Sequence, residues 1–414
     1  MKFWENLDKL SLALFLIIAA FGVVNIYSVD EASGIRQATW LGISVLVGIF
    51  IFMIRNKFFE NMSGVIYILG VLLIMGLFPF GTEILGQKNW YKFGPVSLQP
   101  VEFAKLGVAL LLANYASHPD FNIKNKRSLW TVLIIIGIPA ILVLAIPDVG
   151  SLLIFGAFFI ALYREGLSGW VFGIISLLAF VFLVALYLYF NDISLFYQVG
   201  LILLIMGGIL FFSRFRTNWN FLFVLKILGI AIILCGLTLA TPAIDKKLPS
   251  HQRERIEVLY KGEREFRDTS GYNLLFSKTA IGSGGLTGKG YRQGSVTRGH
   301  FVPEQQTDYI FCTVGEEWGF LGSTLLIICY AIFIGRIYFL AERQKSAYNR
   351  VFGYCFASIL LIHFGVNLGM VMGLFPTVGI PLPYFSYGGS SLLAFTIMTF
   401  IFFKLNIADK RSLI

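Results

Sequence analysis

Long apolar runs recur along the chain and restrict its fold more than any other feature. The first extends from Leu10 to Ser28, and runs of similar length follow as far as Phe403. A helix needs about 20 such residues to cross a bilayer, where the backbone must satisfy its hydrogen bonds internally. The runs do not alternate polar and apolar residues as barrel strands do. Charged residues make up 14% of the chain, against about 25% in soluble domains, so we expect an all-α polytopic membrane protein.

Twelve transmembrane helices are predicted. They are expected at Leu10–Ser28, Ala38–Ile54, Val65–Phe80, Pro100–Tyr115, Leu129–Ile146, Val149–Tyr163, Ser168–Phe190, Tyr197–Phe212, Phe221–Pro242, Tyr309–Gly335, Val351–Phe375 and Gly388–Phe403. Lysine and arginine accumulate in short cytoplasmic loops, and the short loops richest in them, such as the loop with Arg55 and Lys57, fall on one side of this arrangement. Both termini are then cytoplasmic, and residues 1–414 form one integral membrane domain.

A polar stretch at 243–308 interrupts the apolar runs and falls on the outer side of this arrangement. Its cations either balance acids of the same stretch or bind an anionic group outside the membrane, most simply a phosphate, to which arginine offers two parallel donors. Residues 251–260 are expected to form an amphipathic helix on the outer leaflet. The candidate anion-binding cations are Arg253, Arg255, Lys278 and Lys289.

A glycine cluster at 281–290 lies within this stretch and invites comparison with a nucleotide-binding loop. The pattern does not match, because Ser283 stands at the first glycine position and Gly290 follows Lys289, where serine or threonine is required. Backbone amides in such a turn can still cradle a phosphate. The alternative interpretation is a flexible bend.

Charged side chains also occur at the ends of apolar runs. Glu102 and Lys105 stand three residues apart at the start of a helix, so they share one face. They form either a simple ion pair or a functional group, and ionisable residues in a bilayer are usually functional. Asp148 follows a proline and either caps the next helix or serves function. Glu316 and Glu317 are adjacent near the start of another run.

These motifs, in this order and spacing, resemble those of the shape, elongation, division and sporulation family, in its elongation branch. The resemblance extends from about Gln87 to the C-terminus. The motifs are Gln99-Pro100 with Glu102 and Lys105, Pro147-Asp148-Val149-Gly150, Ser277-Lys278, Pro303-Glu304 with Thr307-Asp308, Gly315-Glu316-Glu317, and Pro381–Ser391.

The resemblance implies a peptidoglycan glycosyltransferase of the bacterial cytoplasmic membrane. Such enzymes polymerise lipid II outside that membrane for cell-wall elongation and rod shape, and they work with a class B penicillin-binding transpeptidase. No nucleic-acid partner is expected. The family usually has ten membrane helices, so the segment 197–242 is interpreted as an inserted pair and 243–308 as the catalytic loop. The competing function is a flippase for the lipid-linked precursor, because charges within spans also suit a translocation path.

The resemblance also implies a catalytic aspartate shortly before a glycine-tyrosine pair, here Gly271-Tyr272. Asp268 is the nearest acid and is assigned as general base, with Glu265 as the alternative. A divalent cation, Mg or Mn, could share the charge of the leaving diphosphate, although no ligand spacing for a metal is visible. The predicted substrate-binding residues are Glu102, Lys105, Asp148, Arg253, Arg255, Lys278, Ser283, Lys289, Glu304, Asp308, Glu316 and Ser390.

Overall fold

The computed structural model describes residues 6–84, 87–94, 96–146, 148–191, 193–213, 221–247 and 250–411. They form two compact units, one made of Met1–Leu167 with Asn273–Ile414 and the other of Ser168–Tyr272. The boundary at Tyr272 falls inside the predicted loop 243–308. Pro147, residues 248 and 249 of that loop, and residues 214–220 of the predicted helix pair lie outside the described residues.

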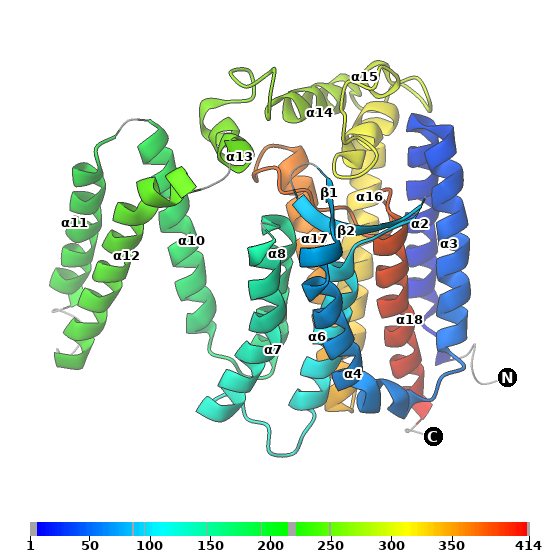
Figure 1. Cartoon of the computed structure of the whole chain (residues 1–414), viewed down its shortest axis with the longest axis horizontal. Coiled ribbons are helices and arrows are strands. Elements are labelled where there is room, and N and C mark those ends of the chain that lie inside the picture. The colour runs from blue at the N-terminus through cyan, green and yellow to red at the C-terminus, as the bar shows by residue number, and fades with distance from the viewer. Residues whose placement is uncertain are drawn as a thin grey trace. The chain divides into compact units, whose positions relative to one another are not determined.

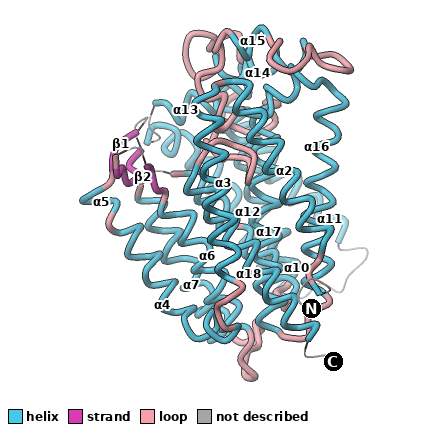
Figure 2. The backbone as a smooth tube through the Cα atoms, turned by 90° about the vertical axis from the view of Figure 1, so that its right-hand side faces the viewer, coloured by secondary structure: helices cyan, strands magenta, loops and turns pink. Residues whose placement is uncertain are grey.

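The first unit contains most of the helices and all of the described strands (Figure 1). The start of α2 and the end of α18 lie at one end of this unit, and the sheet and the segments around α14 and α15 lie toward the other (Figure 2). Its helices are α2 (Lys9–Val29), α3 (Glu31–Ile51), α4 (Asn56–Met75), α5 (Leu77–Phe80), α6 (Pro100–Ala116), α7 (Lys126–Ala145), α8 (Val149–Phe155), α9 (Ala157–Arg164), α14 (Tyr272–Ser283, whose first residue closes the second unit), α15 (Ser295–Arg298), α16 (Ile310–Glu342), α17 (Ala347–Val371) and α18 (Gly389–Arg411).

The second unit is a small helical assembly. Its helices α10, α11 and α12 contact one another, and α13 contacts α10. The bounds are α10 (Gly169–Phe190), α11 (Leu195–Ser213), α12 (Phe221–Lys247) and α13 (Ser250–Lys261). Helix α13 confirms the helix predicted at 251–260.

The helical membrane fold is confirmed, because all twelve predicted segments lie on helices. By length and composition, eight of the described helices could cross a membrane, and three shorter apolar helices lie at Val149–Arg164, Leu195–Phe211 and Ile227–Ala243. The twelfth segment is α6, which carries Glu102 and Lys105. Predicted boundaries were less accurate than predicted elements: α3 begins at Glu31, because Asp30 caps it by accepting a hydrogen bond from the Ser33 amide at 2.8 Å.

A three-stranded antiparallel sheet was not predicted. It consists of β1 (Thr82–Ile84), β2 (Gln87–Phe93) and β3 (Val96–Leu98), in the order β1-β2-β3. Two of the strands have only three residues, too few for an alternating pattern to stand out in the sequence. Successive side chains of β2 point to opposite faces, so Lys88, Trp90 and Lys92 share one face.

Helices α4 and α6 pack closely because small residues lie at their crossing. A Cβ at Gly70 would lie 2.9 Å from the Cα of Ala104, and a Cβ at Gly107 would lie 2.9 Å from the Cα of Tyr67. Close backbone approach at small residues is the usual way in which membrane helices associate. This packing fixes α6, and with it the charged pair at its start.

Helix α16 is broken near its beginning. Gly319 has φ 64° and ψ −160°, so the hydrogen-bonding pattern of the helix is interrupted there. The glycine cluster compensates for the break: the amides of Lys289 and Gly290 donate to the carbonyls of Glu316 and Glu317, each at 3.0 Å. This segment, which the sequence suggested as a phosphate cradle, therefore uses these amides to complete the first part of α16.

Candidate functional site

A buried charged group lies at the start of α6. The Lys105 ammonium donates to Glu102 Oε1 at 2.8 Å, and it lies 2.8 Å from His363 Nε2 on α17. The side chains of Lys105 and Glu102 are 0% and 2% exposed. The ammonium also lies 5.5 Å from the centre of the Phe395 ring. The predicted pairing of Glu102 and Lys105 is confirmed, and His363 completes it.

The hydrogen bonds define the protonation of His363. Its Nδ1 lies 3.2 Å from the Pro381 carbonyl oxygen, which can only accept. Nδ1 therefore carries the proton, and Nε2 accepts from the Lys105 ammonium. The imidazole is neutral in this arrangement, so the group as a whole balances one positive with one negative charge.

Asp148 caps α8 and also accepts a hydrogen bond from the sheet. Its carboxylate accepts from the amide and hydroxyl of Ser151 at 2.9 and 2.8 Å, as an N-cap of α8. It also accepts from the Asn89 side-chain amide on β2 at 3.0 Å. The capping interpretation is confirmed. The contact with Asn89 was not predicted, because nothing in the sequence indicated a strand at this position.

The segment Thr377–Ser391 connects several of the predicted residues. The Asn367 side-chain amide donates to the backbone carbonyls of Asp308 and Ile380 at 2.8 and 2.7 Å. A Cβ at Gly379 would lie 3.3 Å from Asp308 Oδ2. At the far end of the segment, Ser390 Oγ accepts from the Gln99 amide at 3.3 Å.

Two further contacts connect this segment to predicted residues through their neighbours. His363 Nδ1 lies 3.2 Å from the Pro381 carbonyl oxygen, and Gly150, two residues after Asp148, packs against the Val378 carbonyl. The structure thus brings five of the predicted residues together around one backbone segment. We call this set, with His363, the central cluster: Glu102, Lys105, Asp148, Asp308, His363 and Ser390.

A second group of predicted residues surrounds Glu316. The Lys289 ammonium donates to Glu316 Oε1 at 2.7 Å. The other carboxylate oxygen accepts from the amide and hydroxyl of Thr297 at 2.8 and 2.6 Å. The Glu316 side chain is completely buried. Lys289 and Glu316 therefore hold the segment at α15 against α16.

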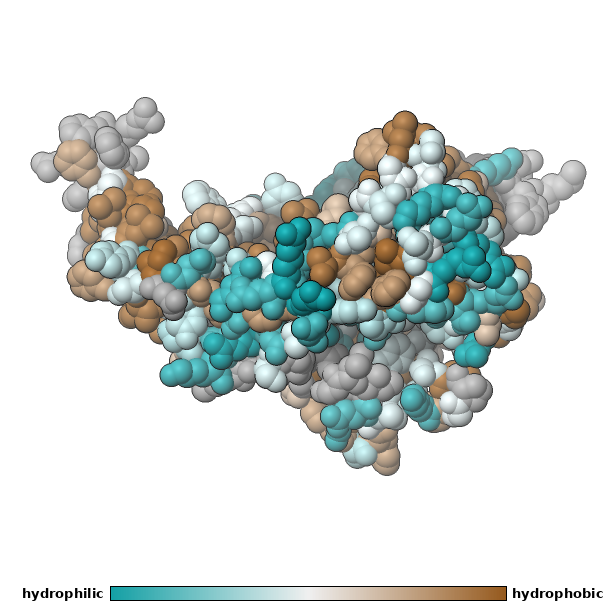
Figure 3. Space-filling model, turned by 90° about the horizontal axis from the view of Figure 1, so that it is seen from above, coloured by the Kyte–Doolittle hydropathy of each residue, from teal (hydrophilic) through white to brown (hydrophobic). Residues whose placement is uncertain are grey.

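The remaining predicted residues of the first unit are Lys278, Ser283 and Glu304. The Ser283 hydroxyl donates to the Ala280 carbonyl at 2.9 Å, and Glu304 accepts from the Thr307 hydroxyl at 3.0 Å. Lys278 is exposed on α14. Hydrophilic side chains gather on the face that Figure 3 shows. The exposed polar residues of 278–300 include Lys278, Gln293, Arg298 and His300.

Asp268, Arg253 and Arg255 belong to the second unit. The Asp268 side chain is 90% exposed, and its Oδ1 lies 3.7 Å from Arg267 Nε. The turn that carries it is held to α13, because the Ser270 hydroxyl donates to Glu254 Oε2 at 2.9 Å. Asp268 is thus an accessible carboxylate on an anchored turn. Glu265 is exposed on the same turn, and Arg255 is half-buried on α13.

Arg253 is engaged by carboxylates of its own unit. Its Nε lies 3.0 Å from Glu257 Oε1 and 3.2 Å from Asp245 Oδ1. Burial raises the pKa of Asp245, and the charge of Arg253 opposes that shift. For Arg253, the interpretation that loop cations balance nearby acids therefore describes the observed contacts.

A divalent cation does not fit the candidate residues. Within the described ranges, no group of three or more His, Cys, Asp or Glu side chains is placed to hold a metal ion. The relevant carboxylates already accept hydrogen bonds, Glu102 from Lys105 and Glu316 from Lys289.

The fold and the central cluster define a polytopic helical membrane protein with a buried ion pair and an accessible polar loop. Comparison with known proteins makes this class specific. The family model for FtsW, RodA and SpoVE, described as cell cycle protein, matches residues 4–195 and 191–411. The chain belongs to this family.

Two relatives agree with this assignment. The chain is 28% identical over 397 residues to the peptidoglycan glycosyltransferase MrdB of Escherichia coli (strain K12), with 94% of this chain and 91% of that protein covered. It is 27% identical over 431 residues to the peptidoglycan glycosyltransferase RodA of Treponema pallidum (strain Nichols), with 97% and 98% covered.

Two solved structures share the fold. One is a chain of a peptidoglycan synthase complex that coordinates polymerization and crosslinking, with a TM-score of 0.70, 23% identity and 97% of both chains covered. The other is the crystal structure of RodA from Thermus thermophilus, with a TM-score of 0.63, 23% identity and 97% of both chains covered.

Proposed function

We propose that this protein is a peptidoglycan glycosyltransferase that polymerises lipid II into glycan strands for cell-wall elongation. The observation that supports this proposal most strongly is the family membership over nearly the whole chain, together with relatives named as peptidoglycan glycosyltransferases. The enzyme takes a sugar hydroxyl of one lipid II molecule as nucleophile, forms a glycosidic bond, and releases polyprenyl diphosphate from the other.

Asp268 acts as the general base in this proposal. A general base must reach the proton that it removes, and its contribution is typically about 10²–10⁴-fold in rate. The exposed carboxylate of Asp268 on an anchored turn meets the requirement for access. It removes the proton of the attacking hydroxyl as the bond to the anomeric carbon forms and the bond to the diphosphate breaks.

The cations of the outer segments bind the diphosphate. Phosphate oxygens accept charge-assisted hydrogen bonds from lysine and arginine, and these bonds strengthen as charge develops on the leaving group. Lys278 is exposed, and Arg255 lies on α13. Arg253 and Lys289 are paired with carboxylates, so they would bind phosphate only by exchanging those partners.

The central cluster has a supporting role. A lysine held between a carboxylate and a neutral imidazole has one ammonium proton left after donating to Glu102 and His363. A preorganised cation of this kind costs no rearrangement during the reaction. We assign Glu102, Lys105, Asp148, Asp308 and Ser390 to this rigid support, with Ser283, Glu304 and Glu316 holding the adjacent loops.

The location and partner follow from the same proposal. The protein is an integral membrane protein of the bacterial cytoplasmic membrane, with both termini in the cytoplasm and the segment 243–308 outside. Residues 197–242 form an inserted helix pair. The partner is a class B penicillin-binding transpeptidase, in line with the similarity to a chain from a complex that couples polymerization to crosslinking.

The test uses the purified full chain with lipid II in detergent, with and without the transpeptidase. We expect the unmodified protein to form glycan polymer. Asp268→Asn should reduce the rate of polymerisation by about 10²–10⁴-fold and should leave thermal unfolding unchanged. Asp120→Asn, an exposed aspartate elsewhere, is the matched control. Full activity in Asp268→Asn together with loss in Glu265→Gln would transfer the role to Glu265.

The flippase alternative has a distinct readout in the same preparation. Vesicles containing the protein and fluorescent lipid II report transbilayer movement through quenching of the outer leaflet. If the lipid moves across the bilayer and no polymer forms in the presence of the transpeptidase, the protein is a transporter and the proposed transferase activity is wrong.

A further inference from the structure

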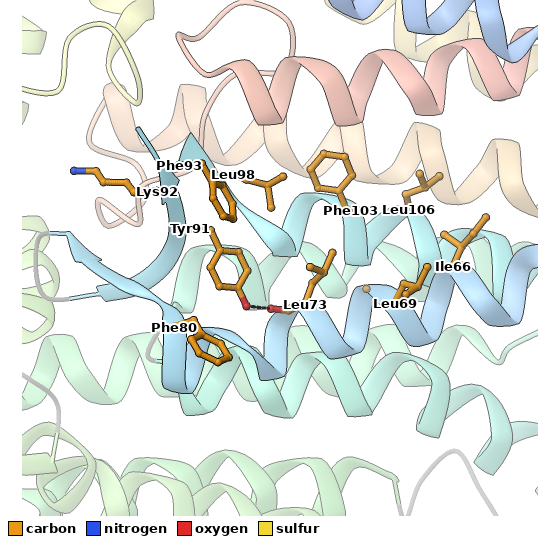
Figure 4. Close-up of a pocket in the computed structure, with 11 residues that line it drawn as sticks. Ile66, Leu69, Leu73, Phe80, Tyr91, Lys92, Phe93, Leu98, Phe103 and Leu106 are labelled. Carbon is orange, nitrogen blue, oxygen red and sulfur yellow. Dashed lines mark hydrogen bonds between the residues drawn. The ribbon is translucent and has the colours of Figure 1, made fainter. Parts of the chain in front are cut away.

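An apolar pocket of about 660 Å³ lies beneath the small sheet, between α4 and α6. Figure 4 shows the side chains of both helices and of β2 and β3 around it. The lining residues are Ile66, Leu69, Gly70, Leu73, Phe80, Tyr91, Lys92, Phe93, Leu98, Phe103 and Leu106. Pockets of about 300–1,000 Å³ with apolar walls are typical of ligand sites.

The pocket opens toward the region that a bilayer would occupy. Leu69, Phe80 and Phe93 line it, yet they are 54%, 77% and 66% exposed. Helix α4 with α5 is a candidate membrane span, and only 22% of an apolar 18-residue stretch within it is buried in the protein. Since exposed apolar side chains on a spanning helix face lipid, hydrocarbon chains have direct access to this pocket.

The polar groups around the pocket select the chemistry of its occupant. Only two lining side chains carry a polar atom, and the Tyr91 hydroxyl already donates to the Leu73 carbonyl at 2.8 Å. Lys92 is the other, and its ammonium points away from the cavity (Figure 4). Lys88 lies on the same face of β2, and both lysines are exposed. The result is an apolar interior with Lys92 at its edge and Lys88 further along the same face of β2.

We propose that this pocket holds an acyl chain of an anionic glycerophospholipid whose phosphate pairs with Lys92, with Lys88 adding positive charge on the same face of β2. None of its lining residues belongs to the central cluster or to residues 250–308. A polyprenyl substrate has to deliver its diphosphate to the reacting groups, whereas the lining of this pocket contains no carboxylate that could act as a general base. The occupant is therefore a resident phospholipid, which goes beyond the proposed polymerase activity.

The bound lipid supports the sheet and thereby the central cluster. Tyr91 lines the pocket, and Asn89, two residues earlier on β2, donates to Asp148 at 3.0 Å. Phe103 and Leu106 line the pocket from α6, on either side of Lys105 in the sequence. A chain that fills the pocket thus packs against both elements that hold these charged groups.

Photolabelling of the purified full chain tests this proposal. The probe is phosphatidylglycerol with a diazirine in one acyl chain, and crosslinks are mapped by peptide mass spectrometry. We expect labels on residues 66–73 and 103–106. Phosphatidylcholine with the same chain should label these peptides less, because each lysine near an anionic headgroup changes occupancy by about fivefold. Equal labelling by the two lipids would overturn the anionic assignment.

Matched variants separate the pocket from the surrounding lipid. Leu69→Trp fills the pocket and should abolish the labels, whereas Ile68→Trp, at a neighbouring exposed position outside the lining, should keep them. Lys92→Gln should reduce labelling by phosphatidylglycerol about fivefold, and Lys57→Gln at the other end of α4 should not. These lysine variants decide the question even if Leu69→Trp fails to fold.

Two further results would reject the proposal. One is equal labelling of the Leu69→Trp and Ile68→Trp proteins. The other is displacement of the phosphatidylglycerol probe by polyprenyl phosphate at equal concentration, which would assign the pocket to the substrate. Neither result depends on polymerase activity, so failure here is distinguishable from failure of the proposed function.

Discussion

The chain contains two acid–base pairs of similar composition in opposite environments. Glu102 and Lys105 form a contact of 2.8 Å with both side chains buried. Asp268 and Arg267 lie 3.7 Å apart with side chains 90% and 72% exposed. A buried pair that loses one partner leaves an uncompensated charge, whereas an exposed pair is solvated by water. The comparison indicates that the buried pair stabilises the fold, whereas the exposed pair is accessible to a substrate.

The largest expected effect is on the buried pair. Lys105→Ala leaves the Glu102 carboxylate buried beside a neutral imidazole, and it should lower the free energy of unfolding by about 3–5 kcal/mol. The double variant Glu102→Gln with Lys105→Met should recover most of this loss, because it removes both charges. Thermal unfolding in detergent measures both proteins. Equal destabilisation by the single and double variants would contradict a pair held together by charge.

A smaller effect is expected where the sheet meets α8. Asp148→Ala removes the cap and the hydrogen bond from the buried Asn89 amide, so it should cost about 1–2 kcal/mol. Asn125 caps α7 with a single bond to the Arg127 amide at 3.1 Å. Asn125→Ala at this exposed cap should therefore cost less than Asp148→Ala in the same unfolding measurement.

A pH-dependent effect is expected in the second unit. Burial raises the pKa of Asp245, against the opposing charge of Arg253. The folded state then binds more protons than the unfolded state above the unfolded pKa of about 3.9, so stability falls as pH rises through the folded pKa. Asp245→Asn should remove this fall. Unfolding midpoints of the unmodified protein and of Asp245→Asn, measured from pH 4 to pH 7, would reveal this fall in stability. Parallel curves for the two proteins would exclude a contribution from Asp245.

The smallest expected effect is on the exposed pair. Arg267→Gln should change the free energy of unfolding by less than about 0.5 kcal/mol, because surface ion pairs contribute little. Thermal unfolding of Arg267→Gln, measured under the same conditions as Lys105→Ala, provides the direct comparison. A loss as large as that of Lys105→Ala would show that the turn at Asp268 is part of the framework.

The sequence predicted the helices well because each needs only a continuous apolar run. It also predicted the contact of Glu102 with Lys105, since a spacing of three residues places side chains on one helical face. His363 was not assigned to this pair, because its partner lies 258 positions away in the chain. An isolated histidine in an apolar run was the available signal.

Other features depend on contacts that sequence patterns do not encode. The sheet has strands too short to alternate visibly, and Gly319 lies inside the predicted helix Tyr309–Gly335 although its φ is 64°. The glycine cluster was predicted as a candidate phosphate site, yet its amides at Lys289 and Gly290 bond to α16. Each partner is distant in sequence, so only the folded chain reveals it.

The break at Gly319 has a mechanical consequence. The glycine cluster is bonded to both sides of this break: its amides donate to the stub before it, and its Gly285 and Leu286 carbonyls accept from the Phe320 and Leu321 amides at 2.9 and 3.1 Å. The cluster therefore bridges the interruption and holds the stub and the membrane span together. A displacement of residues 284–290 would reach the start of the span through these hydrogen bonds.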